Sequence, residues 1–348
     1  MIPLTPKEAV IRIARRILGE ERVHDYLIKR GIKVRHLEEG YTESSEVEES
    51  REGLNGDSHE NCDINRAKRQ TLIFMVDGKW MHGGLTDRLR GMASAYKFAI
   101  EHNLDFKIYH TSPFLLQEIL EPNKVNWLID EKQISKNCSI AKPVLLYRED
   151  FDNDSALEHQ LDKTHEQFHL YSCVDTLGNQ FAEYFNKLFK PSALLTQEIE
   201  HYSKLLGENY TAISFRFQNK LGDFKEFTFK ELPAKGKREL LNAALDVVRR
   251  KMAQNKILVT ADSPTFLAEA AKIPNVVIVK GSSIHIDFNS SKKAVDYLKA
   301  FTEFFLISKA TQARLYRNRK YKTYPSNFPK YAASLGNIPY EIVEDIRT

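Results

Sequence analysis

The sequence contains little cysteine. Its 348 residues include three, Cys62, Cys138 and Cys173, and no two of them are spaced as a CxxC pair or as part of a Cys/His ligand set. Neither a disulfide framework nor a structural zinc site is therefore expected, and the composition is typical of a protein from a reducing compartment. We accordingly expect a cytoplasmic location.

The sequence also lacks a long apolar run and a strong excess of charge. No segment approaches the roughly 18 to 20 apolar residues that a membrane span requires, and Arg12, Arg15 and Arg16 interrupt the N-terminal region where a signal peptide is apolar. The 51 basic and 47 acidic residues give a net charge of +4, which makes no case for a nucleic-acid partner. The motifs GxxxxGK[ST] and GxGxxG are absent, which argues against a P-loop ATPase and a classical dehydrogenase.

The beginning of the chain differs from the rest. In residues 6–18, apolar side chains recur at helical spacing and three arginines fall on the other side, which predicts a basic amphipathic helix within the N-terminal segment 1–40. Such a helix either docks on its own domain or associates peripherally with an anionic membrane surface. Residues 41–65 are rich in acids and predict a disordered linker, so we expect 1–65 to be dispensable for folding of the rest.

From residue 66 onward the pattern is strand, turn and helix, repeated, which predicts an α/β fold with mostly parallel sheets. A first α/β domain, 66–206, has predicted strands at 71–76, 106–110 and 143–147 and ends in a helical stretch, 177–206, whose second helix Pro191 opens. A second α/β domain, 207–348, has predicted strands at 210–217, 256–261, 275–280, 312–316 and 340–343 and helices at 237–253, 264–272, 292–309 and 327–335. Two Rossmann-like domains are thus expected, with ligands at the carboxyl ends of the strands, in the cleft between the domains.

Two candidate site segments follow the first strand of each domain. Gly83 and Gly84 precede a predicted helix, so the backbone approaches a ligand closely there and the helix N–H groups favour an anion. A plain turn capped by Thr86 is the alternative. Arg216 ends the strand 210–217 and is placed to bind a phosphate with two hydrogen bonds, unless it forms a surface ion pair.

Two further segments lie near later strands. Asp262 follows the strand 256–261 and either caps the next helix or accepts hydrogen bonds from a ribose or a base edge. Ser326 introduces the last helix, whose N-terminus favours another phosphate oxygen. Two anion-binding helix starts, one arginine and one acid at strand ends together predict a nucleotide diphosphate as the ligand.

The order of these motifs resembles that of the GDP-fucose-dependent fucosyltransferases, particularly the group with the alpha-1,6- and protein O-fucosyltransferases and the bacterial nodulation fucosyltransferase. GGLTDRLRG (83–91) resembles their GGLGDRLxG element, ISFR (213–216) their HxR element, TADSP (260–264) their (A/T)(T/S)D(S/D) element, and 300–337 their closing region. The resemblance runs from about residue 70 to 345. It implies a GT-B-like fold, GDP-fucose as the donor, and an inverting mechanism without a metal or cofactor.

Carried over by position, the resemblance implies that Arg216 contacts the donor diphosphate during catalysis and that Asp262 helps to hold the nucleoside. The donor-binding residues implied are Gly83, Gly84, Arg88, Arg216, Asp262, Ser263, Ser326, Asn327 and Phe328. Asp87 is our candidate general base, unless it merely pairs with Arg90 or Arg88. His285 and Asp287 are candidate substrate-binding residues. The chain departs from the family where Ser214 replaces a His, Thr86 a Gly, and Phe217-Gln218 more polar residues.

The sequence therefore predicts a glycosyltransferase, namely a fucosyltransferase that transfers fucose from GDP-fucose to a glycan or lipid-linked glycan in the synthesis of a surface polysaccharide or glycoconjugate. One alternative is a catalytically silent nucleotide-binding relative, marked by the departures at Ser214 and Phe217. Another is an enzyme of the same architecture that uses a different nucleotide sugar.

Overall fold

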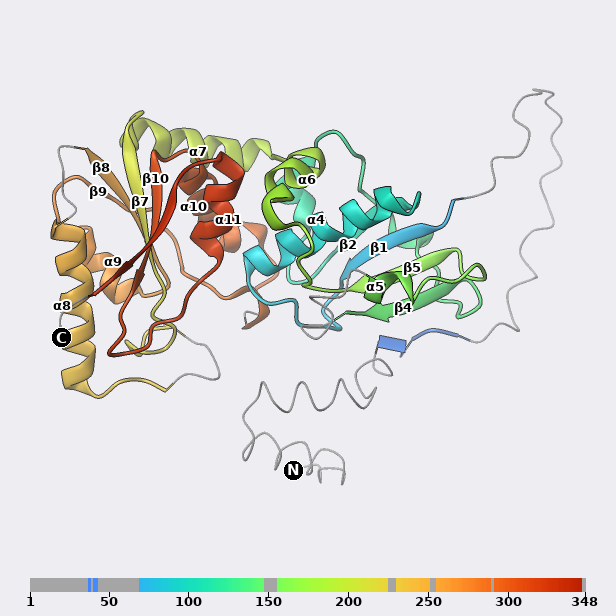
Figure 1. Cartoon of the computed structure of the whole chain (residues 1–348), viewed down its shortest axis with the longest axis horizontal. Helices are drawn as coiled ribbons and strands as arrows, with labels where there is room; N and C mark the ends of the chain where they lie inside the picture. Colours follow the sequence, from blue (N-terminus) through green and yellow to red (C-terminus); the bar gives the residue numbers. More distant parts are fainter. Residues whose placement is uncertain are drawn as a thin grey trace, which may run out of the picture. The chain divides into compact units, whose positions relative to one another are not determined.

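The computed structural model describes residues 37–38, 40–42, 69–146, 155–224, 230–250, 255–288 and 291–345. Most of the predicted N-terminal helix and acidic linker lies outside these described residues. The described chain forms two compact units (Figure 1). The first comprises the described residues up to Trp80 together with Ser94–Tyr109 and Trp127–Thr176, and the second comprises Met81–Ala93, His110–Asn126 and the described residues from Leu177 onward.

The first unit is built on a four-stranded sheet in the order β2-β1-β5-β4, in which β5 runs parallel to β1 and β4. Its elements are β1 (Thr71–Val76), β2 (Asp105–His110), η2 (Glu131–Gln133), β4 (Ala141–Leu145), α5 (Ser155–Glu158) and β5 (Gln167–Tyr171), and α4 (Leu85–Glu101) follows β1. Residues 72–76 of β1 are all buried, as expected for a strand covered on both faces. The central strand β5 was missed from sequence because His169 interrupts its apolar run.

Residues 37–38 and 40–42 are part of the first unit. Leu37 is 0% exposed and packs in a core cluster with Ile73, Met75, Trp80 and Tyr171. The Tyr41 hydroxyl is hydrogen-bonded to Nδ1 of His169 on β5. We therefore expect removal of this short segment to destabilise the first unit, because it would leave apolar surface of the sheet without its cover, whereas the dispensability of the rest of 1–65 stays a prediction.

We expect Leu37→Ala to lower the free energy of unfolding by about 2 to 5 kcal/mol, the usual effect of deleting a fully buried leucine side chain. Glu38→Ala is the matched control, since Glu38 is exposed one residue further along and its loss should change stability by less than about 0.5 kcal/mol. Urea unfolding of the full chain measures both values. Equal effects of the two substitutions would show that Leu37 does not belong to the core.

The second unit contains a five-stranded sheet in the order β11-β10-β7-β8-β9, in which all neighbouring strands run parallel. Its strands are β7 (Tyr210–Phe215), β8 (Lys256–Ala261), β9 (Val276–Val277), β10 (Gln312–Arg317) and β11 (Tyr340–Glu344). The chain moves from β7 outward to β8 and β9 and then crosses to β10 on the other side of β7. The strand order therefore reverses between β7 and β10, as in the Rossmann fold.

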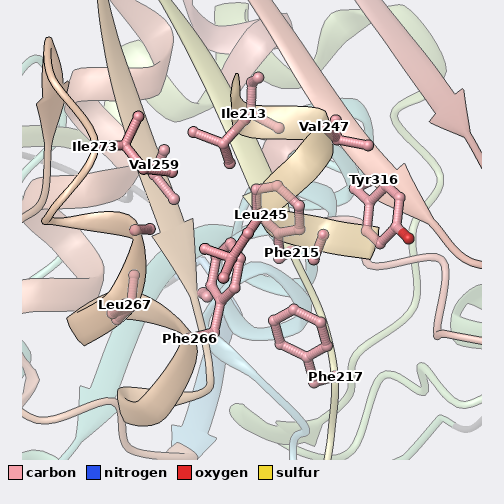
Figure 2. Packing of buried hydrophobic residues seen from close by; sticks show 14 of the residues in the cluster. Ile213, Phe215, Phe217, Leu245, Val247, Val259, Phe266, Leu267, Ile273 and Tyr316 are labelled. Atoms are coloured by element: carbon pink, nitrogen blue, oxygen red, sulfur yellow. The ribbon is translucent and has the colours of Figure 1, made fainter. Parts of the chain in front are cut away.

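Helices cover both faces of this sheet (Figure 1). On one face, α8 (Ala234–Arg250) and α9 (Pro264–Ala270) pack on β7 and β8 around Phe215, Phe217 and Phe266, which Figure 2 shows close together. The other helices are α6 (Phe181–Leu188), α7 (Ala193–Leu206), α10 (Leu298–Ser308) and α11 (Phe328–Gly336). On the other face, the Tyr210 hydroxyl donates to the carbonyl of Leu306 in α10 over 2.6 Å. The remaining elements are η1 (Leu116–Glu118), β3 (Leu120–Pro122), η4 (Gly178–Gln180), β6 (Phe189–Pro191), η5 (Ile286–Phe288) and η6 (Ala294–Tyr297), with β3 antiparallel to β6.

The structure places the stretch 177–206 differently from the sequence prediction. We assigned this stretch to the first domain, but Phe181 packs edge-on against Phe304 and Tyr331, so it belongs to the second unit. Pro191 does not open α7; it ends β6, and Ser192 caps α7 by accepting a hydrogen bond from the Leu195 N–H.

The bounds of other strands and helices differ from the sequence predictions by a few residues. The strand predicted at 143–147 is β4 at Ala141–Leu145, the strand predicted at 275–280 is β9 at Val276–Val277, and the helix predicted at 292–309 is η6 followed by α10. Among the residues that the structure describes, no helix is both long enough and apolar enough to cross a membrane.

Candidate active site

The carboxyl ends of β7 and β10 define the candidate site. In an open α/β sheet, ligands bind outside the carboxyl ends of the strands where the strand order reverses, and in this unit that place lies between β7 and β10. Arg216 directly follows β7, and the segment with Ser326, Asn327 and Phe328 follows β10. The topology therefore brings these sequence-predicted residues to the same edge of the sheet.

An ion pair fixes Arg216 at this edge. Its Nη1 donates to Oδ2 of Asp262 over 2.9 Å, and the guanidinium lies 4.9 Å from the ring centre of Phe224. The Asp262 side chain is 6% exposed and that of Arg216 18%, so the arginine keeps some access to solvent whereas the acid has little. Arg216 and Asp262, which the sequence singled out separately, are thus one unit of the site.

Asp262 also holds the backbone that carries Arg216. Its Oδ1 accepts from the Phe217 N–H over 2.8 Å and its Oδ2 from the Gln218 N–H over 2.7 Å. Gln218 has a φ of 57°, a left-handed conformation that costs energy for a residue with a side chain. Phe217 is 0% exposed in the core, as Figure 2 shows. The structure therefore gives Asp262 a positioning role, while a direct contact with a nucleoside stays a prediction.

Ser263, not Asp262, caps α9. Its Oγ accepts from the Phe266 N–H over 3.1 Å and donates to Asp223 over 2.6 Å, and the residue is 0% exposed. The alternative that Asp262 caps this helix is therefore wrong, because its carboxylate turns back toward the end of β7. The Ser263 hydroxyl thus donates and accepts inside the protein, and a contact of Ser263 with a donor stays a prediction.

The glycine turn before α4 already holds two carboxylates. The Gly83 N–H donates to Oδ2 of Asp287 over 2.5 Å, and the Gly84 N–H donates to Oδ2 of Asp87 over 3.0 Å. Gly83 has a φ of 82°, and a Cβ there would lie 2.6 Å from the Asp87 carboxylate, so only glycine fits. The anion-binding character predicted for this turn is present, but protein carboxylates accept these two hydrogen bonds.

Arg88 and Asp287 form a buried ion pair. The Arg88 Nη2 donates to Asp287 Oδ1 over 2.6 Å, and both side chains are 5% exposed or less. The Arg88 Nη1 also donates to the carbonyl of Ser112 over 3.2 Å. Burial lowers the pKa of Arg88 and raises that of Asp287, and the opposite charge of each partner counters the shift. This pair joins the start of α4 to the segment after β9, and a contact of Arg88 with a donor stays a prediction.

His110, at the end of β2, supports Arg88 and was missed from sequence. Its Nδ1 lies 2.9 Å from the Phe114 carbonyl, so Nδ1 carries the proton, and its Nε2 lies 3.5 Å from the Arg88 Nη1. Burial lowers the pKa of His110 to about 3, and the charge of Arg88 adds to this effect. The only signal in the sequence was a histidine at the carboxyl end of a predicted strand.

We expect acid to destabilise the protein through such buried histidines. The pKa of His110 in the folded protein lies below the unfolded value of about 6.5, so the unfolded chain binds more protons between pH 6.5 and 3 and stability falls as the pH is lowered through that window. His110→Asn keeps a donor for Phe114 without titrating, and should reduce the slope of unfolding free energy near pH 5 by about 1.4 kcal/mol per pH unit. Urea unfolding between pH 4.5 and 7 measures this slope. An unchanged slope would contradict the assignment.

The remaining candidate site residues make contacts within the second unit. Asp87 pairs with Arg90 over 2.7 Å, and its role as a general base stays a prediction. The Ser326 Oγ accepts from the Phe328 N–H over 3.2 Å, and Asn327 is exposed at the start of α11. Ser214, one of the departures from the motif that the sequence resembles, is buried and hydrogen-bonded to Thr260 over 2.8 Å.

The chain is similar in fold to several solved structures. The alpha-1,6-fucosyltransferase NodZ co-crystallised with GDP matches 76% of this chain and 92% of its own length, with a TM-score of 0.50 and 13% identity. Fucosyltransferase NodZ from Bradyrhizobium matches 80% and 96%, with a TM-score of 0.51 and 15% identity. Arabidopsis thaliana FUT1 in complex with GDP matches 96% and 77%, with a TM-score of 0.49 and 10% identity.

No protein-family model and no curated protein sequence matches the chain. At identities of 13% and 15% the likeness to NodZ is one of fold. The α/β fold class predicted from the sequence, with two parallel sheets in the manner of GT-B fucosyltransferases, is confirmed.

Proposed function

We propose that this chain is a glycosyltransferase of the fucosyltransferase type, which transfers fucose from GDP-fucose to a glycan acceptor. The observation that carries the proposal is the position of Arg216. Its ion pair with the Asp262 carboxylate fixes it at the edge of the sheet where ligands bind in Rossmann-like folds. The fold it shares with NodZ, which was crystallised with GDP, supports the same choice of donor.

In this reaction an acceptor oxygen forms a bond to C1 of fucose as the bond between C1 and the β-phosphate oxygen breaks. Negative charge develops on the β-phosphate of the departing GDP, and a fixed cation stabilises that charge more in the transition state than in the ground state. Arg216 supplies the cation, and Asp262 holds it so that little reorganisation is needed. We therefore propose inversion at C1 and no requirement for a divalent metal.

The proton of the acceptor hydroxyl must pass to a base. Asp87 is the proposed base: its carboxylate is one-third exposed, although it also pairs with Arg90 and accepts from Gly84. We further propose that the acceptor is a glycan or lipid-linked glycan of a surface polysaccharide or glycoconjugate, modified in the cytoplasm, with the N-terminal segment available for peripheral membrane contact.

A ligand panel tests the choice of donor. A ligand that binds only the folded state at a hundredfold excess over its Kd stabilises the protein by about 2.7 kcal/mol, so GDP and GDP-fucose should each raise the melting midpoint by a few degrees. UDP should do less because its base differs, and GMP should do less because it lacks the β-phosphate. GDP release from GDP-fucose then measures turnover, which should survive excess EDTA.

Three outcomes separate the alternatives. Equal stabilisation by UDP-sugars and GDP-fucose would reject GDP-fucose as the specific donor and leave the assignment as a glycosyltransferase unchanged. Binding of GDP-fucose without turnover would favour a silent nucleotide-binding relative, consistent with the buried Ser214–Thr260 pair where the family has a histidine. Loss of turnover on chelation, with rescue by a divalent ion, would overturn metal independence.

A further inference from the structure

Residues 217–224, here called the return loop, follow Arg216 and reverse the direction of the chain. The Lys220 N–H donates to the carbonyl of Phe217 over 3.2 Å, which closes a tight turn at the start of the loop. Near its end, Gly222 has a φ of 82°, in the left-handed region that favours glycine. The last residue of the loop therefore comes back to the arginine from which the loop starts.

Phe224, that last residue, packs against the Arg216 guanidinium. The guanidinium carbon lies over the Phe224 ring, 4.9 Å from its centre, and Phe224 is 5% exposed. A cation over the face of an aromatic ring is attracted by the ring's electrons, and more strongly where water is excluded. The hydrogen bond from Nη1 to Asp262 allows the guanidinium to pivot about that atom, and contact with the ring limits this motion.

Asp223 holds the return loop against α9. Its Oδ2 accepts from the Ser263 Oγ over 2.6 Å and from a backbone N–H in the first turn of α9 over 2.9 Å. Ser263 directly follows Asp262 in the chain, just as Phe224 directly follows Asp223. Both residues that contact the guanidinium are therefore next to a residue of the Ser263–Asp223 hydrogen bond, which joins the two contacts into one support.

We propose that Phe224 is a positioning residue for Arg216, which keeps the guanidinium in the orientation in which it meets the β-phosphate of the donor, and that Asp223 keeps Phe224 in place. This inference rests on the proposed function and assigns a role to a segment outside the motifs of the sequence. Because Phe224 acts through Arg216, its loss should reduce recognition of the diphosphate and turnover together.

Two substitutions at Phe224 separate its aromatic face from its bulk. Phe224→Leu retains an apolar side chain but removes the face, whereas Phe224→Tyr retains the face. The strength of a cation–π contact shielded from water predicts that Phe224→Leu lowers the affinity for GDP and the turnover of GDP-fucose roughly 5- to 30-fold. Affinity for GMP, which lacks the β-phosphate, should change little, and Phe224→Tyr should stay close to wild type.

Phe305→Leu is the matched control. Phe305 is 9% exposed on α10 and packs against Phe185, so its replacement removes a similarly buried ring far along the chain from Arg216. This control should lower stability while leaving turnover and the preference for GDP over GMP near those of wild type. Calorimetric titration of the full chain with GDP and GMP measures the affinities, and GDP release from GDP-fucose measures turnover.

A double substitution tests whether Phe224 acts through Arg216. In the Arg216→Ala protein the ring has no guanidinium to orient, so adding Phe224→Leu should cause no further loss of affinity for GDP. A loss by the same factor with and without Arg216 would show that Phe224 acts by another route, and would overturn the proposal.

The other outcomes are also decisive. If Phe224→Leu lowers stability but keeps the preference for GDP over GMP, Phe224 is structural and the inference is wrong. It is also wrong if Phe224→Tyr is as impaired as Phe224→Leu, because the aromatic face is then not what positions Arg216. If Phe224→Leu does not fold, Asp223→Ala decides: it should weaken the preference for GDP in the same direction, and an unchanged preference would overturn the inference.

Failure of the proposed function is visible without any variant. Wild type would then show neither a preference for GDP over GMP nor release of GDP from GDP-fucose, and this inference would fail with it. A wild type that shows both, together with a Phe224→Leu protein that matches it, would overturn this inference alone.

Discussion

Replacing Arg216 with alanine is expected to lower the turnover of GDP-fucose by two to three orders of magnitude. A single donor that stabilises developing negative charge in a transition state contributes about 2.7 to 4 kcal/mol, and Arg216 is the proposed partner of the departing β-phosphate. The ion pair with Asp262 holds the guanidinium in place before the donor arrives. The variant should also lose much of its preference for GDP over GMP, since the missing charge faces the diphosphate.

Two variants make this test specific. Arg216→Lys should recover little turnover, because an ammonium group cannot reproduce the planar fork of the guanidinium. Arg317 ends the neighbouring strand β10 and pairs with Glu344, so Arg317→Ala removes an arginine from an equivalent strand end and should leave turnover near that of wild type. Rates of GDP release from GDP-fucose give the comparison. If the Arg216→Ala protein is folded and its turnover is nearly normal, Arg216 does not stabilise the departing diphosphate.

Replacing Arg88 with methionine is expected to lower the free energy of unfolding by about 3 to 5 kcal/mol, the usual effect of removing one partner from a buried ion pair. Methionine retains much of the apolar stem but leaves the Asp287 carboxylate without its cation, and both side chains are 5% exposed or less. Urea unfolding of the full chain measures the loss. Arg249→Met is the control, because Arg249 pairs with Asp246 on the surface of α8 and its loss should cost less than about 1 kcal/mol.

A second substitution isolates the ion pair from other effects of the first. Adding Asp287→Leu to Arg88→Met removes the uncompensated charge, and we expect part of the lost stability to return. The coupling energy of the cycle should be about 0.5 to 3 kcal/mol, the range found for residues in contact. If Arg88→Met costs no more than Arg249→Met, the pair does not hold the segment after β9 to the start of α4.

The sequence predicted the second sheet well because local signals agreed there. The strand 256–261 is a short apolar run, whereas 312–316 begins with alternating polar and apolar side chains, and both strands are found where the pattern placed them. By contrast, β5 carries His169 in its centre, which becomes compatible with burial through a hydrogen bond to Tyr41, 128 residues earlier. A local pattern cannot report a partner so far away in sequence.

The boundary between the units shows a related limit. Residues 177–206 have the right helical periodicity, but periodicity does not reveal which apolar face a helix will meet. The aromatic side chains of α6 pack against two helices. Phe185 contacts Phe304 and Phe305 of α10, and Phe181 contacts Tyr331 of α11. The same holds for Leu37, which precedes an acidic segment yet lies in the core of the first unit.

By itself, the sequence determined the residue types of the candidate site and the strand ends on which they lie. Arg216 and Asp262 follow apolar runs, and the parallel strands β7 and β8 place them at one edge of the second sheet, whereas the glycine turn follows the apolar run of β1 in the first sheet. Only the tertiary structure decided which charges neutralise one another. Asp262 pairs with Arg216, and Asp287 with Arg88 across 199 positions of the chain, because a buried charge must find a partner and folding alone determines which partner is near.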